Sequence, residues 1–189
     1  VVAVTNKEWN WSLSVTMQHN KNKIKKISNS LKILNDSLNT QASRMPPPIY
    51  EEGHSISAVK AVKSGGIDPA TGREIFIDKD GNPTFEYNYW DKRTYGDSDP
   101  TVSGTLGTYL TFKGFALNML FNYELGATIY NQTLVTRVEG ANPQRNADKR
   151  VFHSRWKKVG DRVKYKNIAD QTTPDITSRF VRDEYMVNM

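Results

Sequence analysis

The 189-residue sequence contains no cysteine, only three histidines and no long run of apolar residues. The absence of cysteine excludes disulfide bonds and thiol chemistry. The histidines are scattered and do not have the spacing of metal ligands; they are His19, His54 and His153. The mean hydropathy is −0.64, and we expect no transmembrane helix. Disulfide-rich scaffolds, histidine metal centres and helical membrane spans are therefore poor explanations of this chain.

A catalytic constellation is also lacking. Glu51 and Glu52 form an isolated acidic pair without a second partner group. The segment 78–82 resembles the start of a calcium-binding loop, but Tyr89 stands where that loop needs a bidentate glutamate. We therefore expect no enzymatic activity, no cofactor and no bound metal.

What the sequence does contain is alternation of apolar and polar residues with a period of two. In one segment, for example, Phe115, Leu117 and Met119 alternate with Ala116 and Asn118. This period places one set of side chains on each face of a β-strand. We predict three such strands, at about residues 8–20, 101–112 and 115–130.

Each alternating run is about ten residues long, which is the length that a tilted strand needs to cross a bilayer core. Aromatic residues lie at the ends of the runs, as in the girdles of outer-membrane barrels. They are Trp9, Trp11, Phe112 and Phe115 at one end, and Tyr123 and Tyr130 at the other. The alternation alone fits a soluble antiparallel sandwich equally well.

The connections between the strands favour the membrane interpretation. The second and third strands are joined by only two residues, Lys113 and Gly114, whereas the stretches 21–100 and 132–182 are long and polar. Outer-membrane barrels have short periplasmic turns and long extracellular loops, and loops of this length are uncommon in sandwiches. We predict an all-β chain that is a fragment of a transmembrane antiparallel β-barrel, with both long loops outside the cell.

The chain begins within a strand-and-turn region and ends where a further strand begins, so we expect a fragment cut at both ends. Three strands cannot close a barrel, and lipid does not tolerate open sheet edges. The remainder of the barrel is therefore an expected partner, whether as another chain or as the rest of the same one.

The first long loop carries a helical pattern. Apolar residues recur at three- and four-residue spacing, which fits one face of a short helix; they are Ile24, Ile27, Leu31, Leu34 and Leu38. We expect this face to pack on the rest of the loop rather than on a partner, although Ile24 and Ile27 could instead continue the first strand. A short strand is also predicted at residues 73–78.

The formal net charge is +6, and the basic residues cluster at 21–26 and 155–166. Basic runs with interleaved aromatics can mark nucleic-acid binding. No nucleic-acid motif accompanies them, so we expect no nucleic-acid partner. On the outer side of a membrane these clusters could meet lipopolysaccharide phosphates or an acidic partner, or could be solvated loops.

Several short motifs together resemble one family. The segments are Asn20 to Ile24, Glu52-Gly53, Gly66 to Gly72 (GIDPATG), Asp99 to Leu117 with its FKGF turn, Arg155 to Asp161 (RWKKVGD), and Ser178 to Asp183. Their order and content resemble the SusC-like family of TonB-dependent outer-membrane transporters, over nearly the whole chain. Thr105, Phe112 and Val159 depart from the family pattern without disturbing the strand-turn-strand logic.

The resemblance implies a large barrel in the outer membrane of a Bacteroidetes-type bacterium, used for nutrient uptake. Such a transporter imports glycans or peptides, is covered by a SusD-like lipoprotein lid, and is energised by the TonB complex through a plug domain that this chain lacks. The alternative function is a soluble extracellular carbohydrate-binding β-sandwich module. The sequence does not distinguish a glycan from a peptide substrate.

Two sets of candidate site residues follow. Three loop aromatics could stack on a ligand or on the lid, or could serve local packing: Trp90, Tyr95 and Trp156. Three polar residues of the third strand would face the barrel lumen: Asn118, Asn122 and Glu124. Glu124 could contact substrate or plug, but a salt bridge to a neighbouring strand is the simpler expectation.

Overall fold

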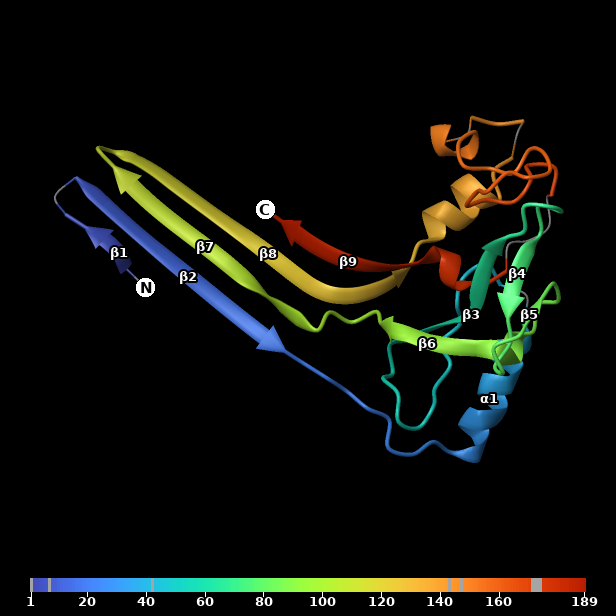
Figure 1. Cartoon of the computed structure of the whole chain (residues 1–189). Helices are drawn as coiled ribbons and strands as arrows, with labels where there is room; N and C mark the ends of the chain where they lie inside the picture. Colours follow the sequence, from blue (N-terminus) through green and yellow to red (C-terminus); the bar gives the residue numbers. More distant parts are fainter. Residues whose placement is uncertain (1, 7, 42, 143, 147, 171–174) are drawn as a thin grey trace.

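The computed structural model describes residues 2–6, 8–41, 43–142, 144–146, 148–170 and 175–189. It has two parts: a long twisted sheet and a compact body at one end of that sheet (Figure 1). The compact body is formed by the described residues of segments 20–101 and 131–180, and we call it the loop body. No helix in the described residues is long and apolar enough to cross a bilayer.

The long sheet is antiparallel throughout, with strand order β1-β2-β7-β8-β9. Its strands are β1 (Val2–Thr5), β2 (Trp9–His19), β7 (Val102–Phe112), β8 (Phe115–Tyr130) and β9 (Val181–Asn188). The three predicted strands are present as β2, β7 and β8. The predicted all-β class therefore holds broadly, although the described strands form an open sheet rather than a closed barrel.

The register aligns the predicted apolar sets on one side of the sheet. Val15 lies opposite Leu106, which in turn lies opposite Phe121. We call this side the apolar face, and it comprises Trp9, Trp11, Leu13, Val15, Met17, Val102, Leu106, Leu110, Phe112, Phe115, Leu117, Met119, Phe121, Tyr123 and Leu125. Because strand side chains alternate, Asn118, Asn122 and Glu124 share the opposite, polar face.

A two-residue turn closes the hairpin of β7 and β8 as predicted. Lys113 has φ 44° and Gly114 has φ 87°, so both central residues occupy left-handed backbone. Such turns match the right-handed twist of the flanking strands. The turn pairs Phe112 with Phe115, and the Trp9 ring lies 4.1 Å from the Phe112 ring, so aromatic side chains gather at this end.

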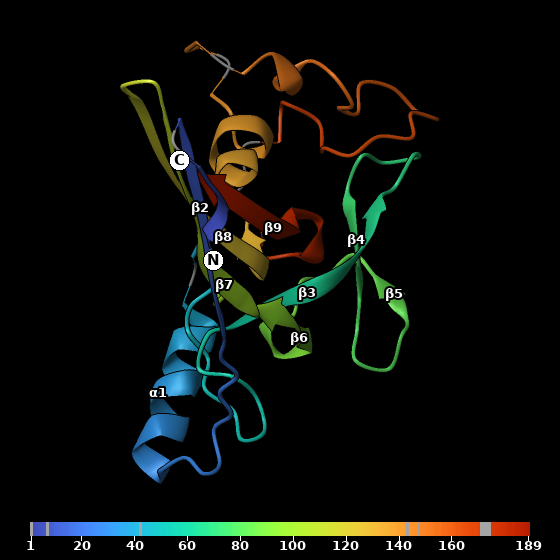
Figure 2. The same cartoon turned by 90° about the vertical axis from the view of Figure 1, so that its left-hand side faces the viewer.

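The loop body is built on a second sheet with order β5-β4-β3-β6. Its strands are β3 (Ala58–Ile67), β4 (Glu74–Ile77), β5 (Pro83–Thr84) and β6 (Lys92–Asp97), and the helix α1 (Asn29–Thr40) lies beside them (Figure 2). Short helical turns are η1 (Tyr89–Asp91), η2 (Leu134–Glu139, a π-helix), η3 (Lys149–Val151) and η4 (Ser178–Phe180).

The strands β3 and β6 were not predicted. A bulge between Ser64 and Gly66 breaks the alternation of β3, and its residues 59–62 are all buried. Such a strand has no polar face for a periodic pattern to reveal. The strand expected at 73–78 is present as β4. The strand β9 begins at Val181, inside the stretch expected to be loop. Its start was not predicted, because the polar residues Arg182 and Asp183 do not show an apolar alternation.

The helix differs from its prediction. It begins only at Asn29, where the Ser28 hydroxyl caps it by accepting a hydrogen bond from the Leu31 amide. The expected apolar face is present only in part, because Leu31 and Leu38 are half-buried, Leu34 remains 47% exposed, and Asn35 is the buried residue. Ile24 precedes the helix and exchanges main-chain hydrogen bonds with residues 53 and 54, so it neither joins the helix nor extends β2.

Buried charge holds the loop body together. The Arg179 guanidinium donates to both carboxylate oxygens of Glu74, at 2.8 and 2.5 Å, and to Glu139 at 2.9 Å. Glu74 comes from β4, Glu139 from η2 and Arg179 from η4, so one cation joins three segments. Burial lowers the pKa of Arg179, but the two carboxylates outweigh it and the net shift is upward.

Apolar packing supports the same region. The cluster comprises Leu134, Val135, Val138 and Phe180, against which Tyr130 and Tyr165 pack. Beside it, buried Arg155 donates to the main-chain oxygens of Val138, Glu139, Val151 and Lys166. The segment 131–180 is therefore an ordered part of the body in its described residues.

Candidate functional site

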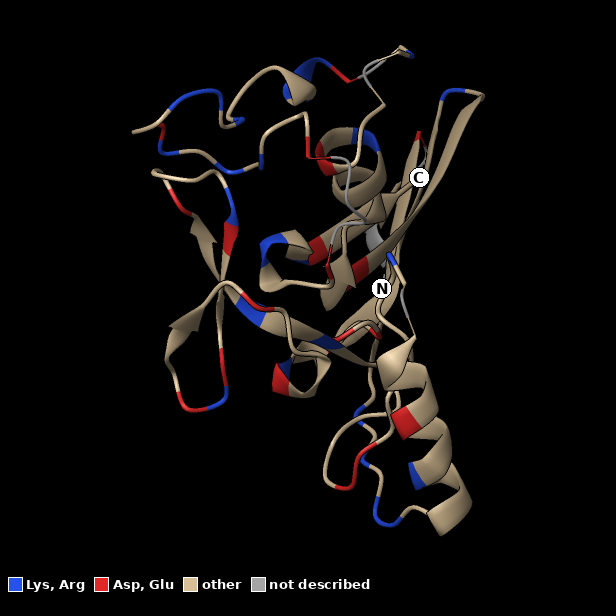
Figure 3. Ribbon diagram, turned by 90° about the vertical axis from the view of Figure 1, so that its right-hand side faces the viewer, with Lys and Arg blue, Asp and Glu red and all other residues tan. Residues whose placement is uncertain are grey.

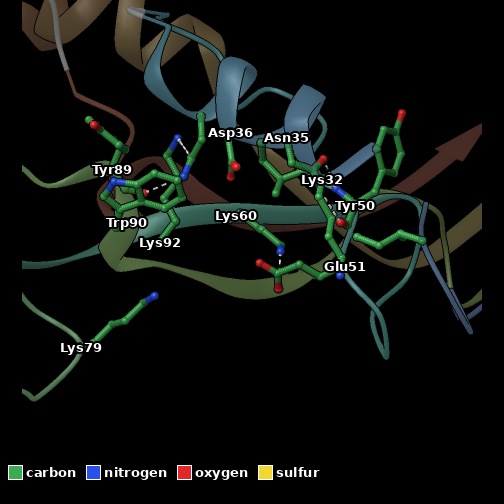
Figure 4. Close-up of a pocket in the computed structure, with 13 residues that line it drawn as sticks. Lys32, Asn35, Asp36, Tyr50, Glu51, Lys60, Lys79, Tyr89, Trp90 and Lys92 are labelled. Atoms are coloured by element: carbon green, nitrogen blue, oxygen red, sulfur yellow. Dashed lines mark hydrogen bonds and ion pairs between the residues drawn. The ribbon is translucent and has the colours of Figure 1, made fainter. Parts of the chain in front are cut away.

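A cavity of about 320 Å³ lies in the loop body between α1, β3 and the η1-β6 segment (Figure 4). Four lysines, two carboxylates and two neighbouring aromatic rings contribute to its wall. We call it the lysine pocket, and these residues are Lys32, Lys60, Lys79, Lys92, Asp36, Glu51, Tyr89 and Trp90. The cavity is of the size that small-molecule sites in proteins occupy.

The helix presents a polar stripe to this pocket. Lys32, Asn35, Asp36 and Asn39 are spaced three and four residues apart, so they share one side of α1. Because α1 turns this polar side toward the pocket wall, the buried residue of the helix is Asn35 rather than a leucine.

Asparagine side chains fix the helix to the pocket wall. The Asn35 amide nitrogen donates to the Tyr50 carbonyl oxygen at 2.6 Å, and its carbonyl oxygen accepts from the Tyr50 amide at 3.0 Å. Asn39 donates to the Tyr89 carbonyl oxygen at 3.3 Å and accepts from the Lys92 ammonium at 2.7 Å. These hydrogen bonds fix α1, which carries Lys32, to the main chain of the pocket wall, and they hold the Lys92 ammonium in place.

The pocket carries an excess of positive charge. Lys60 is 4% exposed, and its ammonium lies 2.6 Å from the carboxylate of Glu51, which is 53% exposed. Among the described residues, no carboxylate lies within 4 Å of the ammonium groups of Lys32, Lys79 or Lys92. Burial, and then the charge of Lys60, lower the pKa of Lys92 to about 8.

Of the three predicted loop aromatics, only Trp90 lies in this pocket. It is 46% exposed, and its ring lies 5.2 Å from that of Tyr89. Tyr95 lies farther along β6 and is 36% exposed. Trp156 joins the two long loops, because its indole nitrogen donates to the Pro69 carbonyl oxygen at 3.0 Å and its ring lies against Gly72.

The predicted lumenal residues are separate from the pocket and lie together on β8. Asn118, Asn122 and Glu124 are each opposite a residue of β7. In the part of the chain that the structure describes, no basic group lies within 4 Å of Glu124. The salt bridge expected for Glu124 is therefore absent there, since its neighbours are Ser103 on β7 and Met186 on β9.

The pocket lysines were missed by sequence reasoning. Lys32 and Lys79 are isolated in the sequence, and Lys60 and Lys92 come from strands that the alternation did not reveal. The one available signal was the polar stripe of α1, which the more obvious leucine spacing obscured.

Comparison with known proteins places this geometry in a wider context. No family model matches the chain. The TonB-dependent receptor P3 of Formosa agariphila is 30% identical over an alignment of 153 residues, in a match that covers 73% of this chain and 15% of that receptor. A solved structure of the RagAB peptide transporter has a TM-score of 0.73 at 21% identity and covers 98% of this chain. The RagAB peptide importer in its 'open-open' state gives 0.73 at 20% identity.

The chain spans only 15% of the receptor and 20% of the matched RagAB chains. The structural similarity shows that the long sheet and the loop body together share the fold of a portion of a RagAB chain. The sequence similarity confirms the resemblance to TonB-dependent receptors that the motifs indicated. These relatives are receptors and transporters rather than enzymes.

Proposed function

We propose that this chain, a relative of TonB-dependent receptors, is one part of the barrel wall and outer vestibule of an outer-membrane nutrient importer. In this role β2, β7, β8 and β9 are neighbouring strands of the wall. The loop body stands on the extracellular side, and the Lys113-Gly114 turn faces the periplasm.

The observation that carries this proposal is the exposed apolar face. Met17 is 74% exposed and Phe115 is 80% exposed on that face. An apolar surface of this extent needs a covering phase, and bilayer lipid covers the outward face of a barrel strand. Charged segments gather on the loop body and at the start of β9, and they leave β2, β7 and β8 nearly free of charge (Figure 3).

Aromatic side chains support the placement of the bilayer. Trp9, Trp11 and Phe115 lie toward the turn, while Tyr123 and Tyr185 lie toward the loop body. Such positions are those of the two aromatic girdles of a barrel. A soluble carbohydrate-binding sandwich, the alternative, would cover the apolar face with a second sheet. In the described residues the second sheet does not cover the apolar face. Its strand β6 instead contacts β8 near the loop-body end, where Gly96 lies against Thr128.

The cargo is a glycan or a peptide, and a SusD-like lipoprotein covers the loop body as a lid. RagAB is described as a peptide importer with 'open-open' and 'closed-closed' states, which supports a vestibule that opens and closes. The TonB complex supplies energy through a plug in the remainder of the protein. The polar face with Asn118, Asn122 and Glu124 lines the lumen.

The proposal is tested by extracting the complete protein from its native outer membrane, with and without detergent. We expect it to require detergent and to copurify with a surface lipoprotein. A strain without TonB should keep the protein in the membrane but lose uptake of its nutrient. Recovery of a folded, monomeric protein in plain buffer would contradict the membrane assignment.

A further inference from the structure

We infer that the lysine pocket binds an acidic saccharide, one whose sugar rings carry carboxylate or sulfate groups. This inference rests on the proposed import function, because it names the class of cargo that the vestibule meets first. It is drawn from the arrangement of charge, aromatic rings and main chain around a single cavity.

The charge of the pocket calls for an anion. Four lysines and two carboxylates line a cavity of about 320 Å³. Lys60 is almost fully buried, and its one carboxylate partner, Glu51, is half exposed and also lies 3.6 Å from His54. Holding a buried cation without full compensation is costly, and a bound anion relieves that cost. Glu51 already occupies one side of the Lys60 ammonium. A bound anion is therefore expected at Lys32, Lys79 and Lys92, whose ammonium groups have no carboxylate within 4 Å among the described residues.

The aromatic rings favour a sugar as the carrier of that anion. Trp90 keeps nearly half of its surface exposed at the pocket, beside the ring of Tyr89. The Asn88 side chain fixes this turn by accepting a hydrogen bond from the Trp90 amide at 3.0 Å. A half-exposed indole offers an apolar surface against which the C–H face of a sugar ring packs, while the polar groups of the sugar reach the lysines.

The main chain of the wall disfavours an extended acidic peptide. A peptide that adds to a sheet edge is recognised through free main-chain groups, whereas an acidic motif can be recognised by basic side chains. Here the amide and the carbonyl of Tyr50 are both bonded to Asn35, and the Tyr89 carbonyl is bonded to Asn39. These three groups are therefore not free for strand addition. An acidic peptide would have to be held by the lysine side chains, and hexaglutamate tests that mode.

The test uses the complete transporter with its lid, purified in detergent, and measures Kd by calorimetry. The probes are trigalacturonate, a sulfated galactose oligosaccharide, neutral maltotriose and hexaglutamate. The variants are Lys92→Met, Lys79→Met at the exposed rim, and Trp90→Ala. Lys158→Met is the matched control, because it removes one exposed lysine of the loop body outside the pocket.

We expect one or both acidic oligosaccharides to bind, and the two arms distinguish carboxylate from sulfate. Lys92→Met and Trp90→Ala should each weaken binding at least tenfold, about 1.4 kcal/mol, with a smaller loss for Lys79→Met and none for Lys158→Met. The inference is wrong if neither acidic oligosaccharide binds, if hexaglutamate binds tighter, or if the pocket variants match the control. Those outcomes leave the detergent requirement and TonB dependence intact, so they are distinct from failure of the import proposal.

Discussion

The long sheet and the loop body are stabilised by opposite means. The sheet exposes its apolar side chains and is held by a regular ladder of main-chain hydrogen bonds, whereas the loop body is held by buried charged side chains from separate segments. A membrane strand depends on the surrounding lipid for its apolar face. In the proposed role the loop body lies in water, where specific contacts such as the Arg179 ion pairs stabilise it.

The sharpest test of this difference is Arg179→Met. The substitution leaves the carboxylates of Glu74 and Glu139 buried without their cation, and breaking a buried ion pair from one side costs about 3–5 kcal/mol. Hydrogen exchange of the complete protein should show loss of protection throughout the loop body and little change in β7 and β8. Arg150→Met is the control, because its bridge to Asp148 is exposed and should be dispensable. Equal loss of protection in the sheet would contradict the division into two regions.

Substitutions on the two faces of the sheet test which face meets lipid. Leu117→Arg places a charge on the apolar face and should impair barrel assembly by about 2–4 kcal/mol near the bilayer midplane. Asn118→Arg, one residue away on the polar face, should be tolerated much better. The fraction of protein that runs as a folded, heat-modifiable barrel on gels is the readout. Similar damage from both substitutions would show that the faces are wrongly assigned.

A smaller effect is expected where the two long loops meet. Gly72 has φ +73°, and a Cβ there would lie 2.6 Å from the Trp156 ring. Gly72→Ala should therefore weaken the packing of residues 155–166 on the first loop, with a total cost of about 1–3 kcal/mol. Gly81→Ala is the matched control, since Gly81 also has positive φ but no atom within 4 Å of an added Cβ. Protection of the Trp156 indole from oxidation should fall only in the first variant, and equal exposure in both would exclude the steric explanation.

The same contrast explains what could be predicted from the sequence. β2, β7, β8 and their turn followed from alternation and from Lys113-Gly114, because both signals are local. The fold of the loop body could not be predicted in this way, because it depends on contacts such as that of Arg179 with Glu74, which are more than a hundred residues apart in the sequence. The spacing of Leu31, Leu34 and Leu38 predicted an apolar face, of which Leu31 and Leu38 are half-buried. It gave no sign that the buried residue of the helix is Asn35, which bonds to Tyr50.

The candidate site divides in the same way. Trp90 was recognisable as an aromatic residue of a long loop, since its type alone suggests contact with a ligand. Lys60 and Lys92 could not be recognised from the sequence, because only the pairing of β3 with β6 brings them together in the pocket. Trp156 and Tyr95 lie outside the pocket. Residue type alone therefore could not distinguish a pocket residue such as Trp90 from one that joins two loops, as Trp156 does.

The finest distinction between the regions is their response to pH, because the loop body holds an amine that titrates near neutrality. The pKa of Lys92 is lowered to about 8, chiefly by burial and then by Lys60. The ionisable groups lining the same pocket are Lys32, Asp36, Tyr50, Glu51, Lys60, Lys79 and Tyr89. Since Lys92 is charged below that pKa and neutral above it, affinity for an acidic oligosaccharide should fall as pH rises from 7 to 9.5, by roughly tenfold or less.

The direction follows from the charge of the bound state. An anion in the pocket favours the protonated amine, so binding should raise the pKa of Lys92 and take up protons near pH 8. Calorimetry of trigalacturonate binding in two buffers of different ionisation enthalpy measures that uptake. Lys92→Met should bind more weakly at pH 7 and should lose the pH step, whereas Lys158→Met should retain both affinity and step. A step that survives in Lys92→Met would assign the titration to another group of the pocket, and barrel assembly should not change over this pH range in any of these proteins.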